Sequence, residues 1–281
     1  LVPITWLVYC RPGFENDAVA ELQHHASLHG VIGEATSGEG WVSLTRVDGE
    51  PVNELHRQAS FNRLIFARQS LAALPALTLS RDDRLTAILE QIKASRWSFE
   101  DIWHETPDTN DGKALTGLIK ALTKPLASEE WEVRLAPHMQ AADLGAAPGG
   151  WTWQLVQRGM YVYAIDNGPM DSELMKTGQI DHLKEDGFTW EPPQRLDWLV
   201  CDIVDKPVRV LAMVERWLIH KWCKEAVFNL KLPMKKRWDE VTRCLGKLEA
   251  SLAKAGVQAD IACRHLYHDR EEVTVHVRLK D

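Results

Sequence analysis

Four residues in the second half of the chain have the chemistry needed to hold a ligand and to move a proton. Asp166 and Asp202 each stand at the end of a short apolar run, and Asp186 ends the expected strand over residues 180–186. Lys231 lies inside another apolar run, AVFNLKL over residues 226–232. A lysine inside an apolar strand is costly unless it has a partner or a task. Its amine removes a proton only in the neutral form, so a base here needs burial and apolar or cationic neighbours that lower its pKa from about 10.4. We therefore expect proton transfer at Lys231, beside a ligand held by the three acids.

A glycine-rich turn comes before these acids. Residues 139–151 read MQAADLGAAPGGW, an apolar run that ends in Asp143 and is followed by Gly145, Pro148 and the pair Gly149–Gly150. This order predicts a strand, a tight turn and the start of a helix, the layout of a nucleotide-binding crevice in an α/β sheet. Glycine lets a backbone pass close to a ligand, and the free N–H groups at a helix start can bind it.

The glycine turn, the acids and Lys231 could each have a purely structural role. The turn could also bind a different cofactor. The dinucleotide pattern G-x-G-x-x-G would need a glycine at Ala147, which disfavours a nicotinamide-dependent dehydrogenase. The turn could be an ordinary αβ-turn with incidental glycines, the acids could be helix caps, and Lys231 could point outward from a strand edge. Three acids in register after the turn favour the binding site.

The elements that must position these residues follow a regular order. Apolar runs alternate with helical patterns, which predicts a doubly wound α/β sheet that closes with a hairpin and contains one antiparallel strand. The expected strands are residues 161–166, 180–186, 197–202, 226–232, 259–267 and 272–278, and the expected helices are 207–224 and 235–255.

The first part of the chain predicts a separate α+β portion. Its expected elements are strands at 6–10, 40–46 and 61–69 with a helix at 14–25, then helical stretches at 84–93 and 113–124 around a strand-like run at 98–109. A length of 281 residues agrees with more than one domain.

Composition excludes several classes of protein. Five scattered cysteines, without a C-x-x-C pair, argue against a disulfide framework and for a reducing cytoplasm. His265 and His268 have no third ligand at metal spacing, so we expect no metal, and the absence of an apolar run of about 18 residues predicts no membrane span. The net charge of −7 allows RNA binding only through a local basic patch.

Several motifs resemble a known family. The form D-L-G-x-x-P-G-G-W over residues 143–151 is similar to motif I of the S-adenosylmethionine-dependent ribose 2′-O-methyltransferases. RPGFE (residues 11–15), LIFARQ (residues 64–69) and DTN (residues 108–110) followed by Lys113 resemble the bacterial 23S ribosomal RNA 2′-O-ribose methyltransferase M family. The resemblance implies a Rossmann-like class I methyltransferase sheet behind an N-terminal α+β portion, ferredoxin-like and THUMP.

The same resemblance divides the chain into three parts. They are a ferredoxin-like segment at residues 1–70, a partial THUMP RNA-binding module at 71–126 and the methyltransferase domain at 127–281. A stretch that the family carries is missing at the junction of Leu126 and Ala127, because residues 124–126 match the THUMP helix whereas 127–131 match a point just before motif I.

The resemblance also implies the cofactor and most of the site. S-adenosylmethionine is expected, with Asp166 at the ribose, Asp186 at the adenine and Asp202 near the transferred methyl group. The residues expected to contact it are Asp143, Gly145, Ala147, Pro148, Gly149, Gly150, Asp166, Asp186 and Asp202.

The catalytic residues are implied by the same resemblance, whereas the RNA-binding residues are inferred from a basic run that follows Pro233. The superfamily's catalytic set resembles Lys-Asp-Lys-Glu, and Asp202, Lys231 and Glu272 match its last three members, while the first lysine falls in the missing stretch. Lys235, Lys236 and Arg237 are expected to contact RNA phosphates, with a solvated helix start as the alternative.

The expected protein is therefore a cytoplasmic, monomeric RNA 2′-O-methyltransferase. Its expected target, taken from the resemblance alone, is a cytidine in the peptidyl-transferase region of 23S rRNA in a protein-poor or early assembly state. The alternative is a non-catalytic RNA-binding or ribosome-assembly protein with a vestigial cofactor fold. The missing first lysine favours that alternative, and the intact set Asp202, Lys231 and Glu272 opposes it.

Overall fold

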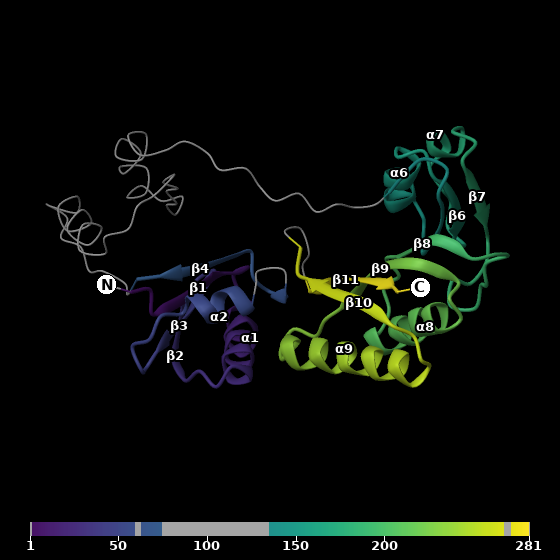
Figure 1. Cartoon of the computed structure of the whole chain (residues 1–281). Helices are drawn as coiled ribbons and strands as arrows, with labels where there is room; N and C mark the ends of the chain where they lie inside the picture. Colours follow the sequence, from purple (N-terminus) through teal and green to yellow (C-terminus); the bar gives the residue numbers. More distant parts are fainter. Residues whose placement is uncertain (1, 60–62, 75–134, 267–270, 281) are drawn as a thin grey trace, which may run out of the picture. The chain divides into compact units, whose positions relative to one another are not determined.

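The computed structural model describes residues 2–59, 63–74, 135–266 and 271–280 (Figure 1). Nearly all of them belong to one compact unit formed by Pro3–Pro75 and Leu135–Asp281. The elements expected at 84–93, 98–109 and 113–124 lie outside the described residues. No helix in the described ranges is long and apolar enough to cross a membrane.

The N-terminal segment forms a four-stranded antiparallel sheet in the order β2-β3-β1-β4. Its helix α1 carries Ala18, Leu22 and Ala26 four residues apart, so that one face is buried while the other is polar. The elements are β1 (Thr5–Tyr9), α1 (Glu15–Leu28), β2 (Gly33–Gly38), β3 (Trp41–Arg46), α2 (Asn53–Gln58) and β4 (Gln69–Ala73).

The strand expected over residues 61–69 is wrong for its described residues 63–68, because the backbone there makes its hydrogen bonds with other parts of the chain. Buried Glu21 accepts the N–H groups of Ile65 and Phe66 at 2.5 and 3.0 Å. Arg264 donates to the Leu64 carbonyl at 2.7 Å. Because these backbone N–H and C=O groups are already hydrogen-bonded, the segment does not pair as a strand. Strand β4 begins only at Gln69.

The second sheet has seven strands in the order β10-β11-β9-β8-β5-β6-β7. Strands β5 to β9 run parallel, and β11 is antiparallel to both of its neighbours, as the sequence predicted. The strands are β5 (Gln140–Leu144), β6 (Tyr161–Ile165), β7 (Ile180–Leu183), β8 (Leu196–Cys201), β9 (Cys223–Lys231), β10 (Ala259–Arg264) and β11 (Glu272–Leu279). The helices are α6 (Gly150–Val156), α7 (Ser172–Met175), α8 (Pro207–Ile219) and α9 (Arg237–Lys254).

Helices cover this sheet from two sides. Helix α6 packs Leu155 and Val156 into one core cluster with strands β5, β6 and β8. The apolar stripes of α8 and α9 join the other cluster, which contains Phe228 and Leu230 of β9. This is the layered α/β arrangement in which ligands bind at the carboxyl ends of the parallel strands.

Two helix boundaries differ from the expected ones. Helix α8 ends at Ile219 instead of residue 224, because Lys221 has a positive φ of 54° and Cys223 already belongs to strand β9. Helix α9 starts at Arg237 rather than at residue 235, since Lys236 is left-handed with φ 58°. In both places a residue in the left-handed region marks the helix boundary: Lys221 lies after the end of α8, and Lys236 lies before the start of α9.

Candidate active site

A cavity of about 330 Å³ opens at the carboxyl ends of β5, β6, β7 and β8. It lies at the topological switch point between β5 and β8, where the strand order reverses. Open α/β sheets bind their ligands at such a point. Its lining residues are Gly145, Ile165, Asp166, Asn167, Glu185, Asp186, Gly187, Phe188, Asp202, Ile203 and Val204. The structure thus brings Gly145 and the three acids expected from the sequence into one cavity.

The glycine turn is built around two positions that only glycine fits. Gly145 has φ 79°, and a Cβ there would lie 2.7 Å from Cγ1 of Ile203. Gly149 has φ 121°, and a Cβ there would lie 2.4 Å from Cδ2 of Leu174. Both glycines are therefore required by local packing as well as by backbone conformation. The Ala147–Pro148 peptide bond between them is cis.

Asp166 fastens this turn from the next strand. Its carboxylate accepts the N–H of Ala147 at 3.1 Å and the N–H of Gly168 at 2.7 Å. A carboxylate offers about four acceptor sites, so the group keeps capacity for the hydroxyls of a ribose. The side chain is half-buried on the cavity wall.

Asp143 is placed differently from the other acids. It is 1% exposed and is absent from the cavity wall, and Thr152 of α6 donates to its Oδ2 at 2.6 Å. Burial raises the pKa of Asp143 to about 7, although the hydrogen bond from Thr152 acts in the opposite direction. Its Oδ1 has no partner among the described residues. Buried Asp143 therefore stabilises the helix start that follows the glycine turn, through its hydrogen bond with Thr152.

Asp186 and Phe188 form the outer wall of the cavity. Asp186 is exposed and accepts the N–H of Phe188 at 2.9 Å, which fixes the loop after β7. Arg216 donates to the Phe188 carbonyl at 2.9 Å, and the guanidinium of Arg209 lies 4.5 Å from the centroid of the Phe188 ring. Helix α8 thus holds an aromatic ring at the cavity. The sequence did not single out Phe188, whose supporting arginines come from a later element.

Asp202 is oriented by two residues that the sequence did not assign to the site. Nδ2 of Asn229 donates to Asp202 Oδ1 at 2.9 Å. The hydroxyl of Thr274 donates to Oδ1 of Asn229 at 2.8 Å, which fixes the amide so that its N–H₂ faces Asp202. Asn229 is 6% exposed. This chain of hydrogen bonds joins the ends of β8, β9 and β11, and it could be found only from the pairing of distant strands.

Lys231 and Glu272 meet at the same end of the sheet. Lys231 is the last residue of β9, Glu272 is the first of β11, and the two are directly opposite in the strand register. The Lys231 ammonium contacts the Glu272 carboxylate. The Lys231 side chain is 32% exposed, so it lies at the strand end, where a substrate can reach it, and not within the core.

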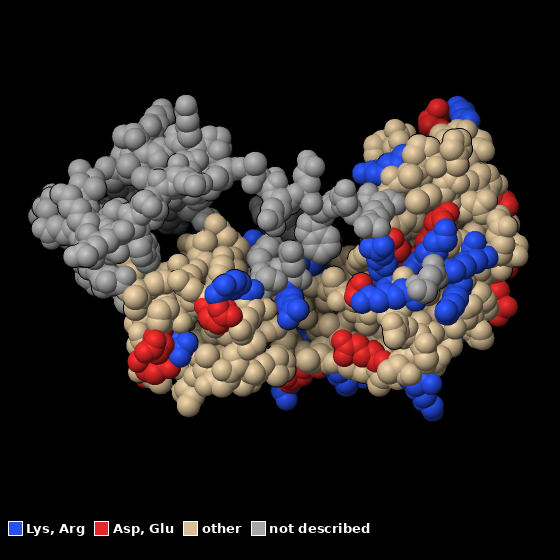
Figure 2. Space-filling model, viewed as in Figure 1, with Lys and Arg blue, Asp and Glu red and all other residues tan. Residues whose placement is uncertain are grey.

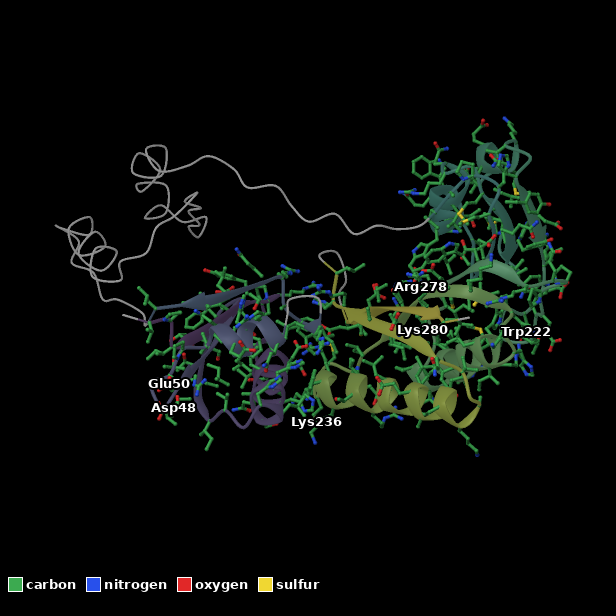
Figure 3. All side chains as sticks on the ribbon, viewed as in Figure 1. Asp48, Glu50, Trp222, Lys236, Arg278 and Lys280 are labelled. Atoms are coloured by element: carbon green, nitrogen blue, oxygen red, sulfur yellow. The ribbon has the colours of Figure 1, made fainter. Side chains whose placement is uncertain are left out.

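The three basic residues after β9 do not form one group. Lys235 and Lys236 are exposed, and Lys236 lies at the start of α9 (Figure 3). Arg237 is 7% exposed and is bonded to Glu271 and Asp17 at 2.6 and 3.1 Å. A guanidinium held in this way is unavailable to an RNA phosphate, so only the two lysines remain candidates for RNA contact.

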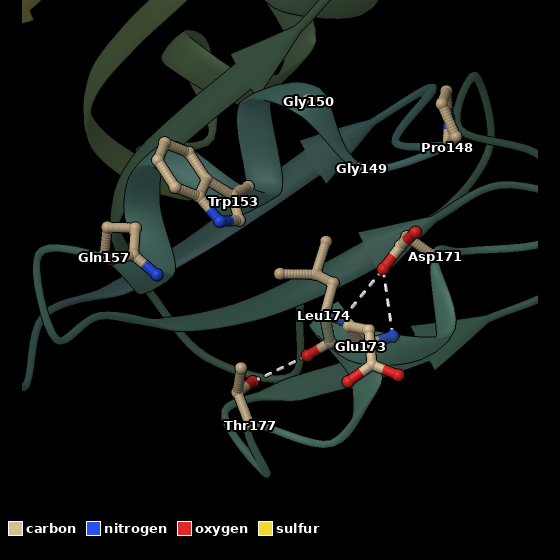
Figure 4. Close-up of a pocket in the computed structure, with 9 residues that line it drawn as sticks. All are labelled: Pro148, Gly149, Gly150, Trp153, Gln157, Asp171, Glu173, Leu174 and Thr177. Carbon is tan, nitrogen blue, oxygen red and sulfur yellow. Dashed lines mark hydrogen bonds between the residues drawn. The ribbon is translucent and has the colours of Figure 1, made fainter.

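A second hollow of about 430 Å³ lies behind the glycine turn, between α6 and α7 (Figure 4). Trp153 of α6 and Gln157, which follows this helix, line it on one side, and Leu174 lines it from α7. Asp171 caps α7 by accepting the N–H groups of Glu173 and Leu174 at 2.9 and 3.0 Å. Pro148, Gly149 and Gly150 line this hollow, and they do not line the cavity of the three acids.

The sheet and its site define a class of protein. The sheet is doubly wound, with a glycine turn after β5, acids at the ends of β6 and β8 and a lysine at the end of β9. Residues 126–237, which contain these features, match the model of FtsJ-like methyltransferases. The chain is therefore a methyltransferase of the class that uses S-adenosylmethionine. The model of the RlmM ferredoxin-like domain matches residues 4–71, and the model of the N-terminal region of ribosomal RNA large subunit methyltransferase M matches residues 83–131.

The chain belongs to the family of ribosomal RNA large subunit methyltransferase M. The protein of that name from Chromohalobacter salexigens is 51% identical over 353 aligned positions, which cover 99% of each chain. The protein of that name from a Marinomonas species is 40% identical over 348 positions, covering 98% of this chain and 99% of the relative.

Solved structures show weaker similarity. Aeropyrum pernix fibrillarin in complex with S-adenosyl-L-methionine is 15% identical, with a TM-score of 0.37 over 59% of this chain and 74% of that one. The 23S rRNA methyltransferase ErmE is 14% identical, with a TM-score of 0.38 over 52% and 63%.

The match with the Chromohalobacter salexigens relative is longer than this chain. It spans 353 positions, whereas this chain has 281 residues, a difference of 72. The matches to the N-terminal and FtsJ-like models meet at residues 126–131. The stretch missing at the Leu126–Ala127 junction stays a prediction.

Proposed function

We propose that this protein transfers a methyl group from S-adenosylmethionine to the ribose 2′-OH of one cytidine in the peptidyl-transferase region of 23S rRNA. The observation that carries the proposal is the convergence of Asp202, Lys231 and Glu272 at the sheet end that holds the cavity. The family to which the chain belongs supports ribosomal RNA as the substrate class. We further propose that the protein acts as a cytoplasmic monomer on a protein-poor or early assembly state of the RNA.

The cavity suits the proposed cofactor. Asp166 offers acceptor sites for two ribose hydroxyls, while Phe188 and Ile203 offer apolar surface to a purine beside the polar Asp186. Asp202 places negative charge where a sulfonium would lie. When bound, S-adenosylmethionine supplies an electrophilic methyl group, so the residues around it need only align the reactants and take up a proton.

In the proposed reaction Lys231 removes the proton of the 2′-OH as the oxygen attacks the methyl carbon. Glu272 contacts the Lys231 side chain and orients it. Asn229 holds Asp202 in a fixed direction, so that this carboxylate faces the reacting centre without being a proton acceptor in the reaction. Lys235 and Lys236 are proposed to contact RNA phosphates beside the site.

A local basic surface supports the choice of RNA despite the net charge of −7. Figure 2 shows Lys and Arg side chains gathered over the region of strands β9, β10 and β11. Arg278 and Lys280 lie in this region (Figure 3), and both are exposed. Such a patch can attract a phosphate backbone independently of sequence.

The decisive experiment is methylation of protein-free 23S rRNA with labelled S-adenosylmethionine, with enzyme in excess and the product nucleotide mapped. We expect a single 2′-O-methylated cytidine. Methyl groups on a base, or no transfer at all, would overturn the proposal, and the second result would favour a non-catalytic RNA-binding protein. Calorimetry with S-adenosylmethionine and with NAD separates both outcomes from a dehydrogenase.

The Asp166→Ala variant tests the cofactor site directly. We expect its affinity for S-adenosylmethionine to fall by about 1–3 kcal/mol, the cost of leaving buried polar groups without partners. The carboxylate also holds the N–H of Ala147, so the variant loosens the turn as well. Calorimetry measures the change, with Asp181→Ala on β7 as the control because Asp181 does not line the cavity. Unchanged affinity in the Asp166 variant would remove this residue from the cofactor site.

A further inference from the structure

Arg237 is a buried cation held by two carboxylates from distant parts of the chain. Its side chain is 8% exposed. Its Nε donates to Glu271 at 2.6 Å, and its Nη1 donates to Asp17 at 3.1 Å and to the Gly13 carbonyl at 3.2 Å. The centre of the guanidinium lies 4.0 Å from the centroid of the Phe14 ring. Loss of one partner from such a set leaves a buried charge uncompensated, so the arrangement holds all of its members in place.

Asp17 links the N-terminal segment to helix α9. Lys236, the residue before the helix, makes no side-chain capping hydrogen bond. Asp17 of α1 instead accepts the N–H of Trp238 at 2.9 Å through Oδ1, while its Oδ2 accepts from Arg237. A carboxylate at this point serves as the cap and also complements the positive end of the helix dipole. The start of α9, and Arg237 with it, is thereby fixed by a residue of the N-terminal segment.

Glu271 links Arg237 to the catalytic pair. It comes directly before Glu272, and successive side chains along an extended chain point to opposite sides. Glu271 turns to Arg237, whereas Glu272 turns to Lys231. The N–H of Leu232 donates to the Glu271 carbonyl at 2.7 Å, so the backbone at Glu271 is held beside the end of β9. Displacement of Glu271 would therefore move Glu272 relative to Lys231.

We propose that Arg237 is a positioning residue for the Glu272–Lys231 pair. Through Glu271 it fixes the start of β11, and through Asp17 it makes this position depend on the docked N-terminal segment. The catalytic geometry is then complete only when the N-terminal segment is in place. This inference rests on the proposed function, in which Glu272 orients Lys231.

The test uses Glu271→Ala in the whole protein, because this change cuts the link to β11 while the Arg237–Asp17 pair stays intact. We expect the single-turnover rate of methyl transfer at saturating cofactor and RNA to fall by about 10- to 100-fold, since a misplacement of about 1 Å can cost ~10²-fold. Affinity for S-adenosylmethionine should not change. Glu271→Gln keeps an acceptor oxygen for Arg237 and should restore most of the rate.

The matched control is Glu240→Ala. Half-buried Glu240 pairs with exposed Arg243 on the same helix at 2.5 Å, and this pair lies within α9 instead of linking it to β11. The control should keep the rate of the unmodified protein. The positioning role is tested further in a Glu272→Gln background, where Glu271→Ala should cause no additional loss because its effect passes through Glu272.

Two results would overturn the inference. One is an unchanged rate in Glu271→Ala, and the other is the same fold-loss in the Glu272→Gln background, which would indicate a general structural role. If the unmodified protein transfers no methyl group, the proposed function fails on its own. Hydrogen exchange then decides the positioning role: faster exchange of the amides of residues 271–275 in Glu271→Ala supports it, and unchanged exchange refutes it.

Discussion

Replacement of Lys231 by alanine should slow methyl transfer by at least ~10²-fold, the usual contribution of a positioned base, and leave cofactor binding nearly intact. Lys231→Arg should be equally inactive, because a guanidinium stays protonated and cannot accept the 2′-OH proton. The side chain stands at the end of β9 beside Glu272, apart from the residues that line the cofactor cavity. Single-turnover assays with labelled S-adenosylmethionine give the rates, and calorimetry gives the affinity.

The control for this prediction lies on the same strand. Lys224, near the start of β9, is exposed and pairs with Asp197 at 2.7 Å, so Lys224→Arg should keep the full rate. An active Lys231→Arg variant would show that this position supplies positive charge or an RNA contact, and the base would have to be another group.

Strands β6 and β8 of the parallel sheet could be predicted well from the sequence because each is an apolar run followed by an acid. Strand β7 (IDHL) has no such run, and it ends at Leu183 instead of residue 186. The strand expected at 161–166 is β6, and the one expected at 197–202 is β8, each within one residue. Strand β2, with the sequence GEATSG, was missed because it carries no apolar alternation. It forms only because β3 offers an edge for pairing, and a local pattern does not contain that information.

The site was predictable to the same extent. Residues at strand ends could be placed at one edge, because parallel strands bring their carboxyl ends together. The partners that orient them could not be placed. Arg237 meets Asp17 across 220 positions of sequence and Glu271 across 34, so a basic run after a strand gave no sign that its third member is buried. The role of Asn229 could not be predicted either, because it depends on Thr274 of β11, which pairs with β9 only in the folded chain.

The largest gain in activity should come from restoring the missing stretch. The family pattern resembles Lys-Asp-Lys-Glu, and the resemblance predicts that its first lysine falls in the stretch missing from this chain. Insertion at the Leu126–Ala127 junction of the segment that this resemblance predicts should raise the rate by ~10²-fold or more. This is the range lost when one preorganised charge-stabilising group is removed from an active site.

The test of the insertion needs the natural protein as a reference and a control that identifies the added lysine. Intact mass comes first: 31.9 kDa would show that the natural chain has 281 residues, and a larger mass would show that the stretch is present in the cell. In the insertion variant, each lysine of the added segment is then replaced by alanine in turn, and one replacement should return the rate to that of the 281-residue chain. If the insertion brings no gain while S-adenosylmethionine still binds, the missing lysine does not limit the reaction. If neither chain transfers methyl groups although S-adenosylmethionine binds, the non-catalytic RNA-binding alternative accounts for this chain better than an enzyme does, because a complete catalytic set would have been supplied without effect.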